Sequence, residues 1–283
     1  MEELTNQLIT YKGIIVVTWI VLLFLSERLF PAVNQGQDGE AKADITKASI
    51  AKASIAKASI RRVFPLRVRR NIGLWMFNII LSPLIVIQLT LWATSHSLDW
   101  RPLFMTGWQG LLLDILVMDF LIYWWHRLNH EVPFLWRFHE IHHLDDTLDT
   151  TSALRFHFGE VLLSATARAG VVLILDISFI SVVVFETTVL IATVFHHSNI
   201  KLPKRLESSL KYVFITPEIH WIHHHAIRVD TDSNYGTVFS WWDPLFRTNS
   251  KNPRKLDMRI GVEGIRDKGF LSLLIRPFIW KRN

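Results

Sequence analysis

Histidines crowd one part of this chain. Twelve of its thirteen histidines lie between residues 126 and 225. All but His157 form four short groups, in chain order: His126 and His130; His139, His142 and His143; His196 and His197; and His220, His223, His224 and His225. Imidazole nitrogens are good ligands for iron, zinc, copper and nickel, whereas magnesium and calcium prefer oxygen. The crowding therefore predicts a site for transition-metal ions.

The spacing within the groups fits ligands carried by helices. Residues three and four apart lie on the same face of a helix, so the members of one group can point their rings at a common centre. Adjacent residues diverge by about 100° around a helix, so His142 and His143 most naturally serve two different ions. The same spacing of one histidine, two other residues and a histidine pair returns at His220, His223 and His224. The repeat predicts a site for two metal ions.

Two kinds of metal chemistry fit this pattern. The string from His139 to His143, with Glu140 second, formally fits the H-E-x-x-H motif of zinc proteases. A single zinc ion takes only about three protein ligands, however, and the chain offers many more histidines than that. The surplus favours a dinuclear non-haem iron site. A membrane zinc hydrolase and a non-catalytic membrane metal-binding protein are the alternatives.

Composition narrows the class of protein further. The chain has no cysteine, which excludes disulfides, thiolate-ligated iron–sulfur clusters and cysteine nucleophiles. Half of its 283 residues are hydrophobic and only 20% are charged, whereas an average soluble domain has roughly 25% charged residues. The formal charge of +6 could suggest nucleic acid, but the apolar excess favours a lipid neighbour. We therefore expect a membrane protein that binds no nucleic acid.

Apolar segments surround the histidine groups. A helix that crosses a bilayer needs about 20 mostly apolar residues. The candidate segments are 8–30, 72–94, 108–125 and 161–194. The last segment is interrupted near Asp176, Ile177 and Ser178, which indicates two helices in a hairpin or a re-entrant pair. The predicted fold is an all-α integral membrane protein with about four transmembrane helices and a helical cap that carries the histidines.

Basic residues predict the orientation in the membrane. Cytoplasmic loops carry an excess of Lys and Arg. The region 31–71 holds nine of them, whereas the loop 95–107 holds only Arg101. The basic loop is therefore expected on the cytoplasmic side, and counting helices puts the histidine groups there too. The expected parts are a transmembrane anchor (1–30), a basic low-complexity linker with a Lys-Ala-Ser-Ile-Ala repeat (31–71), a catalytic region (72–250) and a tail with a candidate interfacial helix (251–283).

The ordered motifs resemble the membrane fatty acid hydroxylase and sterol desaturase superfamily over roughly residues 119–248. The matching strings are Asp119-x3-Tyr123-Trp124-x-His126-Arg127-x2-His130, Leu135-Trp136-x-Phe138-His139-x2-His142-His143, Arg155-x-His157, His197-Ser198-Asn199, Thr216-Pro217-x2-His220-x2-His223-His224, Asp232-x-Asn234-Tyr235-Gly236 and Trp242-Asp243-x2-Phe246. The resemblance implies an oxidoreductase with a di-iron centre that uses O2 and an external electron donor. It implies hydroxylation or desaturation of a C–H bond in a membrane lipid, such as a sterol, a fatty acyl chain or an alkylglycerol ether.

Carried over position by position, the resemblance implies nine iron ligands. They are His126, His130, His139, His142, His143, His197, His220, His223 and His224. Five further residues are candidates either as ligands or as hydrogen-bond partners of ligands: Asp119, Tyr123, His157, His196 and Asn234. After His157 the chain has Phe158-Gly159-Glu160 where the family usually has Pro-Leu-Glu.

The electrons must come from a separate protein, because the chain has no cysteine for a redox cluster of its own. A ferredoxin-like or cytochrome-like protein is the expected donor. Complementary charge speeds the encounter of two proteins, so basic residues near the cap are candidates for docking an acidic donor. They are Arg127, Arg137, Lys201, Lys204 and Arg205.

Overall fold

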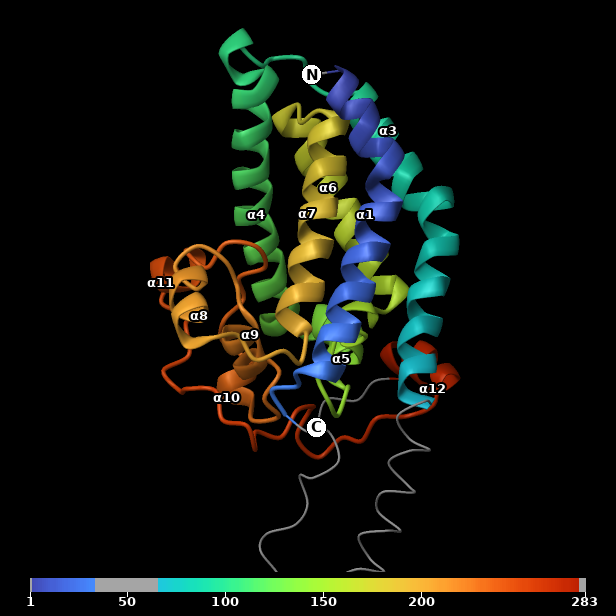
Figure 1. The fold of residues 1–283 in the computed structure, drawn as a ribbon. Coiled ribbons are helices and arrows are strands. Elements are labelled where there is room, and N and C mark those ends of the chain that lie inside the picture. The colour runs from blue at the N-terminus through green and yellow to red at the C-terminus, as the bar shows by residue number, and fades with distance from the viewer. Residues whose placement is uncertain (1, 34–65, 280–283) are drawn as a thin grey trace, which may run out of the picture.

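A computed structural model describes residues 2–33 and 66–279. Within these ranges the regular elements are helices, and the only β-pairing consists of isolated bridges. Long helices stand side by side as a bundle (Figure 1). They are α1 (Glu2–Leu29), Leu66–Ser95, α4 (Gly107–Glu131), α6 (Phe158–Leu175) and α7 (Phe179–His197). The all-α prediction is confirmed.

Three described helices are long and apolar enough to cross a membrane. They are Leu66–Ser95, α6 and α7. The helices α1 and α4, which the sequence predicts as further crossings, have 28 and 25 residues. α1 packs against α7, and α4 packs against α7 and the cap, so both belong to the same bundle. That α1 and α4 also cross the membrane remains a prediction.

The helix Leu66–Ser95 changes its winding in the middle. A π-helical turn, η1 (Ser82–Val86), separates its first part from α3 (Ile87–Ser95). Pro83 lies in this turn, where its missing N–H cannot make the regular helical hydrogen bond. The helix extends at least six residues ahead of Ile72, where the apolar segment begins in the sequence. It thereby includes Arg67, which is buried.

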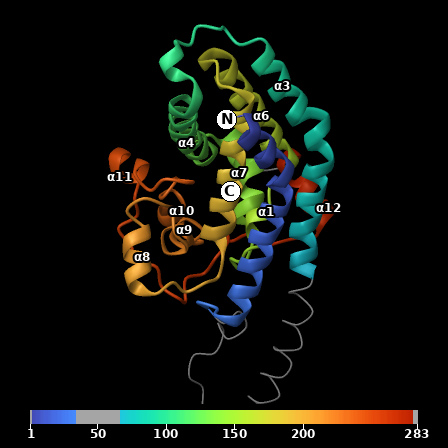
Figure 2. The same cartoon turned by 45° about the horizontal axis from the view of Figure 1, so that its top comes forward.

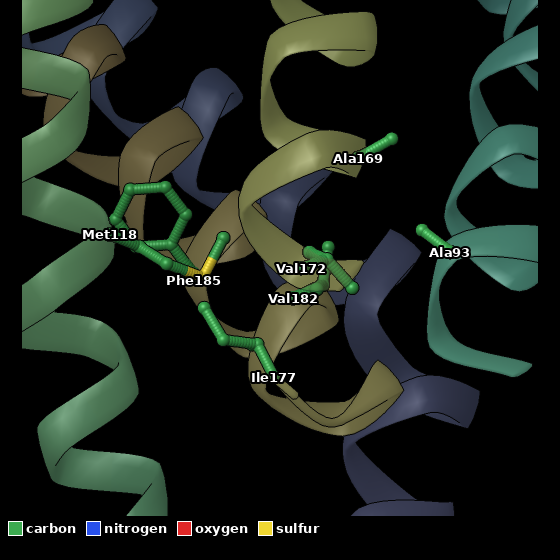
Figure 3. Close-up of a cluster of buried hydrophobic side chains, with 7 residues drawn as sticks. All are labelled: Ala93, Met118, Ala169, Val172, Ile177, Val182 and Phe185. Carbon is green, nitrogen blue, oxygen red and sulfur yellow. The ribbon is translucent and has the colours of Figure 1, made fainter. Parts of the chain in front are cut away.

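The apolar segment 161–194 forms a hairpin of α6 and α7. α6 ends at Asp176, which adopts the left-handed conformation with φ 54°. The hydroxyl of Ser178 then accepts a hydrogen bond from the Ser181 N–H and caps the start of α7. The predicted interruption at residues 176–178 is therefore confirmed. Ile177 packs into a buried apolar cluster with Ala93, Met118, Ala169, Val172, Val182 and Phe185, which joins α3, α4, α6 and α7 (Figure 3).

Short helices form a cap at one end of the bundle. They are α5 (Pro133–His143), η3 (Ser152–Leu154), α8 (Lys204–Leu210), α9 (Pro217–His223), α10 (Arg228–Thr231), α11 (Trp242–Phe246), α12 (Phe270–Ile275) and η4 (Arg276–Phe278). The start of α1 and the short η2 (Leu103–Met105) lie at the other end (Figure 1). The Lys-Ala-Ser-Ile-Ala repeat and most of the predicted linker lie outside the described residues.

The C-terminal tail packs onto the cap. Leu273 of α12 is fully buried in a cluster with Leu74, Ile141 and Leu144. Beyond α12, the guanidinium of Arg276 donates to the carboxylate of Glu140 at 2.6 Å. The tail therefore covers the outer side of α5, the helix that carries the second histidine group.

Buried charges tie the cap to the bundle. The guanidinium of Arg67 donates to Asp145 at 2.5 Å and to Asp149 at 2.7 Å. Arg155 is equally buried and pairs with Asp267 of the tail at 2.6 Å. Buried charges are tolerated only when they are paired and hydrogen-bonded, as they are here. The network joins the start of the helix Leu66–Ser95 to the loop that follows α5.

Candidate metal centre

The nine histidines implied as ligands come together in two buried groups. The five-histidine group consists of His126, His130, His139, His143 and His223. The four-histidine group consists of His142, His197, His220 and His224. Within each group, one ring nitrogen from every histidine lies within 4.8 Å of the others. The two groups contain all nine of the predicted ligands and no other residue.

Neighbouring histidines separate between the groups as helix geometry predicts. His143 belongs to the five-histidine group and His142 to the four-histidine group. In the same way, His223 belongs to the first group and His224 to the second. The two groups nevertheless adjoin, since the rings of His143 and His224 stack at 4.4 Å between centroids. The arrangement offers two adjacent centres, each with its own donors.

Four helices converge to build the site. His126 and His130 lie in the last turns of α4, and His197 ends α7. Pro133 and Pro217 occupy the first turns of α5 and α9, where the missing N–H of proline costs nothing. The histidines of these short helices come together with those at the ends of α4 and α7. All of these helix ends lie at the cap end of the bundle (Figures 1 and 2).

Most of the ligand candidates are oriented through Nδ1. Backbone carbonyls accept from four of these rings, in the pairs His126–Tyr235 (2.8 Å), His142–Arg155 (3.2 Å), His197–Thr193 (2.8 Å) and His223–Ser233 (2.7 Å). Carboxylates contact two more, in the pairs His139–Glu160 (2.6 Å) and His130–Asp232 (3.2 Å). A metal-binding histidine almost always donates its second ring N–H to such a group. Six rings thus have Nε2 left to face the centre.

The Nε2 atoms face one another at distances that fit ligands of a shared cation. His142 and His197 each donate Nδ1–H to a carbonyl, so each neutral ring carries its lone pair on Nε2. These two Nε2 atoms lie 3.0 Å apart, so in these tautomers their lone pairs face each other. His220 extends the contact, with its Nε2 3.2 Å from that of His197. Nitrogens bound at about 2.1 Å to one ion lie about 3 Å apart, so a metal ion turns this repulsion into coordination.

The rings are held neutral by their burial. Desolvation lowers the pKa of His142, His143, His220, His223 and His224 well below the ordinary value, and neighbouring histidines lower it further. Unpaired atoms inside the groups include His130 Nε2 and His223 Nε2. A neutral ring with a free lone pair is the form of histidine that binds metal. Buried, neutral and unpaired nitrogens therefore fit a bound cation.

Three of the five further candidate residues, Asp119, Tyr123 and Asn234, form hydrogen bonds with loops and helices around the site. Asp119 accepts from the backbone N–H groups of Val238 and Phe239, both at 3.1 Å, and from the Trp242 indole. The Tyr123 hydroxyl lies 2.8 Å from that of Thr248. Asn234 has a φ of 54° and uses its side chain to bind the backbone of residues 219 and 250. None of these three side chains contacts a ligand ring through a hydrogen bond that the structure describes.

The remaining histidines lie outside the two groups. His157 caps α6, because its Nδ1 accepts from the Gly159 N–H at 2.9 Å and its Nε2 lies 3.0 Å from the Leu274 carbonyl. His196 is buried with its ring 4.0 Å from that of His220. His225 pairs with Asp230. His96, the one histidine outside residues 126–225, lies exposed at the C-terminal end of α3.

The zinc-protease pattern lacks its base. His139 and His143 do lie in one group. Glu140, which would activate water in such an enzyme, is buried and bound to Arg276 of the tail. Its carboxylate is therefore committed to a structural ion pair.

Sequence reasoning missed the groups that orient the rings. The Glu160 carboxylate comes from the first turn of α6, and the carbonyls of Ser233 and Tyr235 come from a loop about 100 residues after α4. A backbone carbonyl has no signature in the sequence. Glu160 could have been noticed in the sequence, because it is a carboxylate at the start of an apolar helix.

Comparisons with known proteins give the family of the segment that carries the site. The fatty acid hydroxylase family model matches residues 111–248. The ornithine lipid hydroxylase OlsE of Rhizobium tropici is 30% identical over 183 residues, which is 65% of this chain and 54% of the relative. Human alkylglycerol monooxygenase is 31% identical, over 50% of this chain and 30% of its own length. Cholesterol 25-hydroxylase of Rattus norvegicus is 25% identical, over 65% of this chain and 61% of its own length.

The chain spans about half the length of the first of these relatives, and less of the alkylglycerol monooxygenases. No solved structure matches. The matched segment contains both histidine groups, the α6–α7 hairpin and the loops that hold the ring nitrogens. It also contains the whole of residues 119–248, whose motifs resemble the superfamily. Residues 111–248 therefore belong to the fatty acid hydroxylase family.

Proposed function

We propose that this protein holds two iron ions in its two histidine groups and catalyses the O2-dependent oxidation of a C–H bond in a membrane lipid. The reaction is a hydroxylation or a desaturation. The histidine groups lie on the cytoplasmic side of the membrane, and a separate ferredoxin-like or cytochrome-like protein supplies the electrons. The nine histidines of the two groups are the ligands.

The facing Nε2 atoms are the observation that carries this proposal. Five and four histidines, six of them with a tautomer that leaves Nε2 unprotonated, supply donors for two adjacent ions. A single structural or catalytic zinc needs far fewer ligands. Family membership of residues 111–248 favours iron over the other metals that imidazole binds.

Iron bound in these groups would activate O2 with electrons that arrive from the donor protein. The chain's own residues position and shield it. Carbonyl and carboxylate acceptors fix the tautomer of six rings, so that Nε2 stays unprotonated. Burial excludes water from the rings, which protects a reactive centre from side reactions.

The membrane helices supply the route for the lipid. α4 and α7 both end at the histidine groups. A lipid that lies between these helices in the bilayer can therefore bring one of its carbon atoms to the metal centre. The relatives are named for ornithine lipid, alkylglycerol and cholesterol, all of them lipids. This supports a membrane lipid as the substrate class.

The five basic residues predicted to dock the electron donor have different surroundings in the structure. Lys201, Lys204 and Arg205 are exposed in and before α8. Arg127 pairs with Glu131 at 2.7 Å, and Arg137 lies over the ring of Phe134. We therefore place the electron donor's contact at Lys201, which is exposed just ahead of α8.

Lipid profiling tests the proposal. Cells that express the wild-type chain should accumulate lipids that gain one oxygen or lose two hydrogens. His142→Ala removes one donor from the four-histidine group and should abolish these products. His96→Ala, at the exposed end of α3, is the control and should leave them unchanged. Unchanged lipid profiles with the wild-type chain, or full activity of His142→Ala with normal iron content, would contradict the proposal.

A further inference from the structure

One lobe of the cap presents an aromatic surface. Residues 204–215 and 238–246, here called the α8–α11 lobe, meet through backbone hydrogen bonds from Ile215 to Val238 and from Ser240 to Val213. Side chains alternate between the two faces of such a pair. Ile215 and Val238 are buried on one face. The opposite face carries the rings, which are Tyr212, Phe214, Phe239 and Trp241.

These rings form an ordered layer, in which Phe239 is half-buried and the other three are exposed. Phe239 stacks on Trp241 with centroids 4.5 Å apart and planes 2° from parallel, and Phe214 stacks on Phe239 at 6.0 Å. Tyr212 is 72% exposed and Leu245 of α11 is 64% exposed. Large apolar side chains gathered in this way mark a contact surface.

The lobe is fastened to α4, which the sequence predicts to cross the membrane. Asp119 binds two backbone N–H groups of the lobe, and Phe120 and Trp124 pack on Phe246 of α11. Asp119 precedes His126 by seven residues, which is about 10 Å along a helix. A crossing that begins at Gly107 needs about 20 residues and so ends near His126. The lobe therefore stands beside the last part of this predicted crossing rather than beyond it, and Figure 1 shows α11 beside the lower half of α4.

The charges of the lobe fit a bilayer surface. Lys204, Arg205 and Lys211 are exposed in and just after α8, in the same lobe as the aromatic layer. Trp and Tyr are enriched where a membrane meets water, and Lys and Arg near that boundary are attracted to anionic headgroups. A lobe that carries both exposed aromatic rings and cations has the composition of such a boundary.

We propose that the α8–α11 lobe lies in the headgroup layer of the bilayer and docks the cap against the membrane surface. The aromatic layer and Leu245 contact lipid, while the basic residues of α8 face anionic headgroups. Asp119 is the residue that holds the lobe at this depth. The proposal concerns membrane contact alone and does not depend on bound metal or on catalysis.

Spin labels test this directly, because the chain has no cysteine of its own. Leu245→Cys places a label in the lobe. Val229→Cys is the matched control, since Val229 is apolar and 78% exposed but lies in α10, in another part of the cap. Each labelled protein, in nanodiscs that contain phosphatidylglycerol, is measured by power saturation with O2, which concentrates in lipid, and with a water-soluble nickel chelate.

We expect the label at residue 245 to collide several-fold more with O2 than with the nickel chelate, relative to the label at residue 229. Tyr212→Cys gives an independent second position and should behave like residue 245. Collision ratios for residues 245 and 212 equal to that of residue 229 would overturn the proposal. Protection from both reagents together with spin–spin broadening would also overturn it, because it would show that a second copy of the chain covers the lobe.

Discussion

Removing the carboxylate of Glu160 should weaken metal binding in the five-histidine group. Its Oε1 atom lies 2.6 Å from Nδ1 of His139, and the pair is buried. In Glu160→Ala the ring loses this partner, and its N–H is left buried without an acceptor. A hydrogen bond to a charged group contributes about 1.5–3 kcal/mol. Each 1.4 kcal/mol is a tenfold change in affinity, so we expect a loss of about 10- to 100-fold.

The assay is competition with an iron chelator on the purified protein in nanodiscs. In Glu160→Ala, the iron in the five-histidine group should leave at a chelator concentration about 10- to 100-fold lower than in the wild-type protein. The other half of the iron should be unaffected, because the four-histidine group does not contain His139. Glu160→Gln keeps an oxygen acceptor and should lose less. Glu131→Ala, an exposed carboxylate on α4, is the control and should change affinity less than twofold. Wild-type affinity in Glu160→Ala, with unchanged helix content, would refute the idea that this carboxylate orients a ligand.

Three further predictions follow from the structure. His157→Ala should lower the free energy of unfolding by about 1 kcal/mol, as loss of a helix cap does, yet keep the wild-type iron content; loss of iron would instead identify His157 as a ligand. Arg67→Ala should destabilise by about 3–5 kcal/mol, measured by denaturation, because Asp145 and Asp149 stay buried without their partner; a change under 1 kcal/mol would contradict the buried network. The metal-free protein should lose thermal stability as pH falls below about 6.5. Burial lowers the pKa of rings such as His142 and His220 in the folded chain, so at such pH values the unfolded chain binds more protons than the folded chain. A melting temperature that stays constant or rises from pH 7 to pH 5 would contradict this prediction.

The spacing of the histidines could predict much of the site. A helix repeats every 3.6 residues, so the separation of His142 from His143 into different groups is a local property that the sequence displays. The break at Asp176 was predictable for the same reason, because a polar interruption in a segment too long for one crossing must be a turn. The resemblance to a known family then selected the nine residues that the structure brings together.

The supporting residues could not be predicted, because their roles depend on contacts between distant segments. Asp119 lies on the helix that carries His126 and His130, so a role beside those rings was reasonable, but its carboxylate points to the backbone of residues 238 and 239. Arg67 stood among basic residues that predict a cytoplasmic loop, yet it is buried against two aspartates. Charge alone does not distinguish a loop residue from a buried ion pair.

The central claim is that two iron ions lie between imidazole nitrogens in adjacent groups. Mössbauer spectroscopy on protein grown with ⁵⁷Fe, together with elemental analysis, tests it most directly. The account predicts about two irons per chain in a nitrogen-rich, magnetically coupled pair, with the coupling lost in His142→Ala. One zinc per chain, or isolated uncoupled iron in the fully loaded wild-type protein, would contradict it.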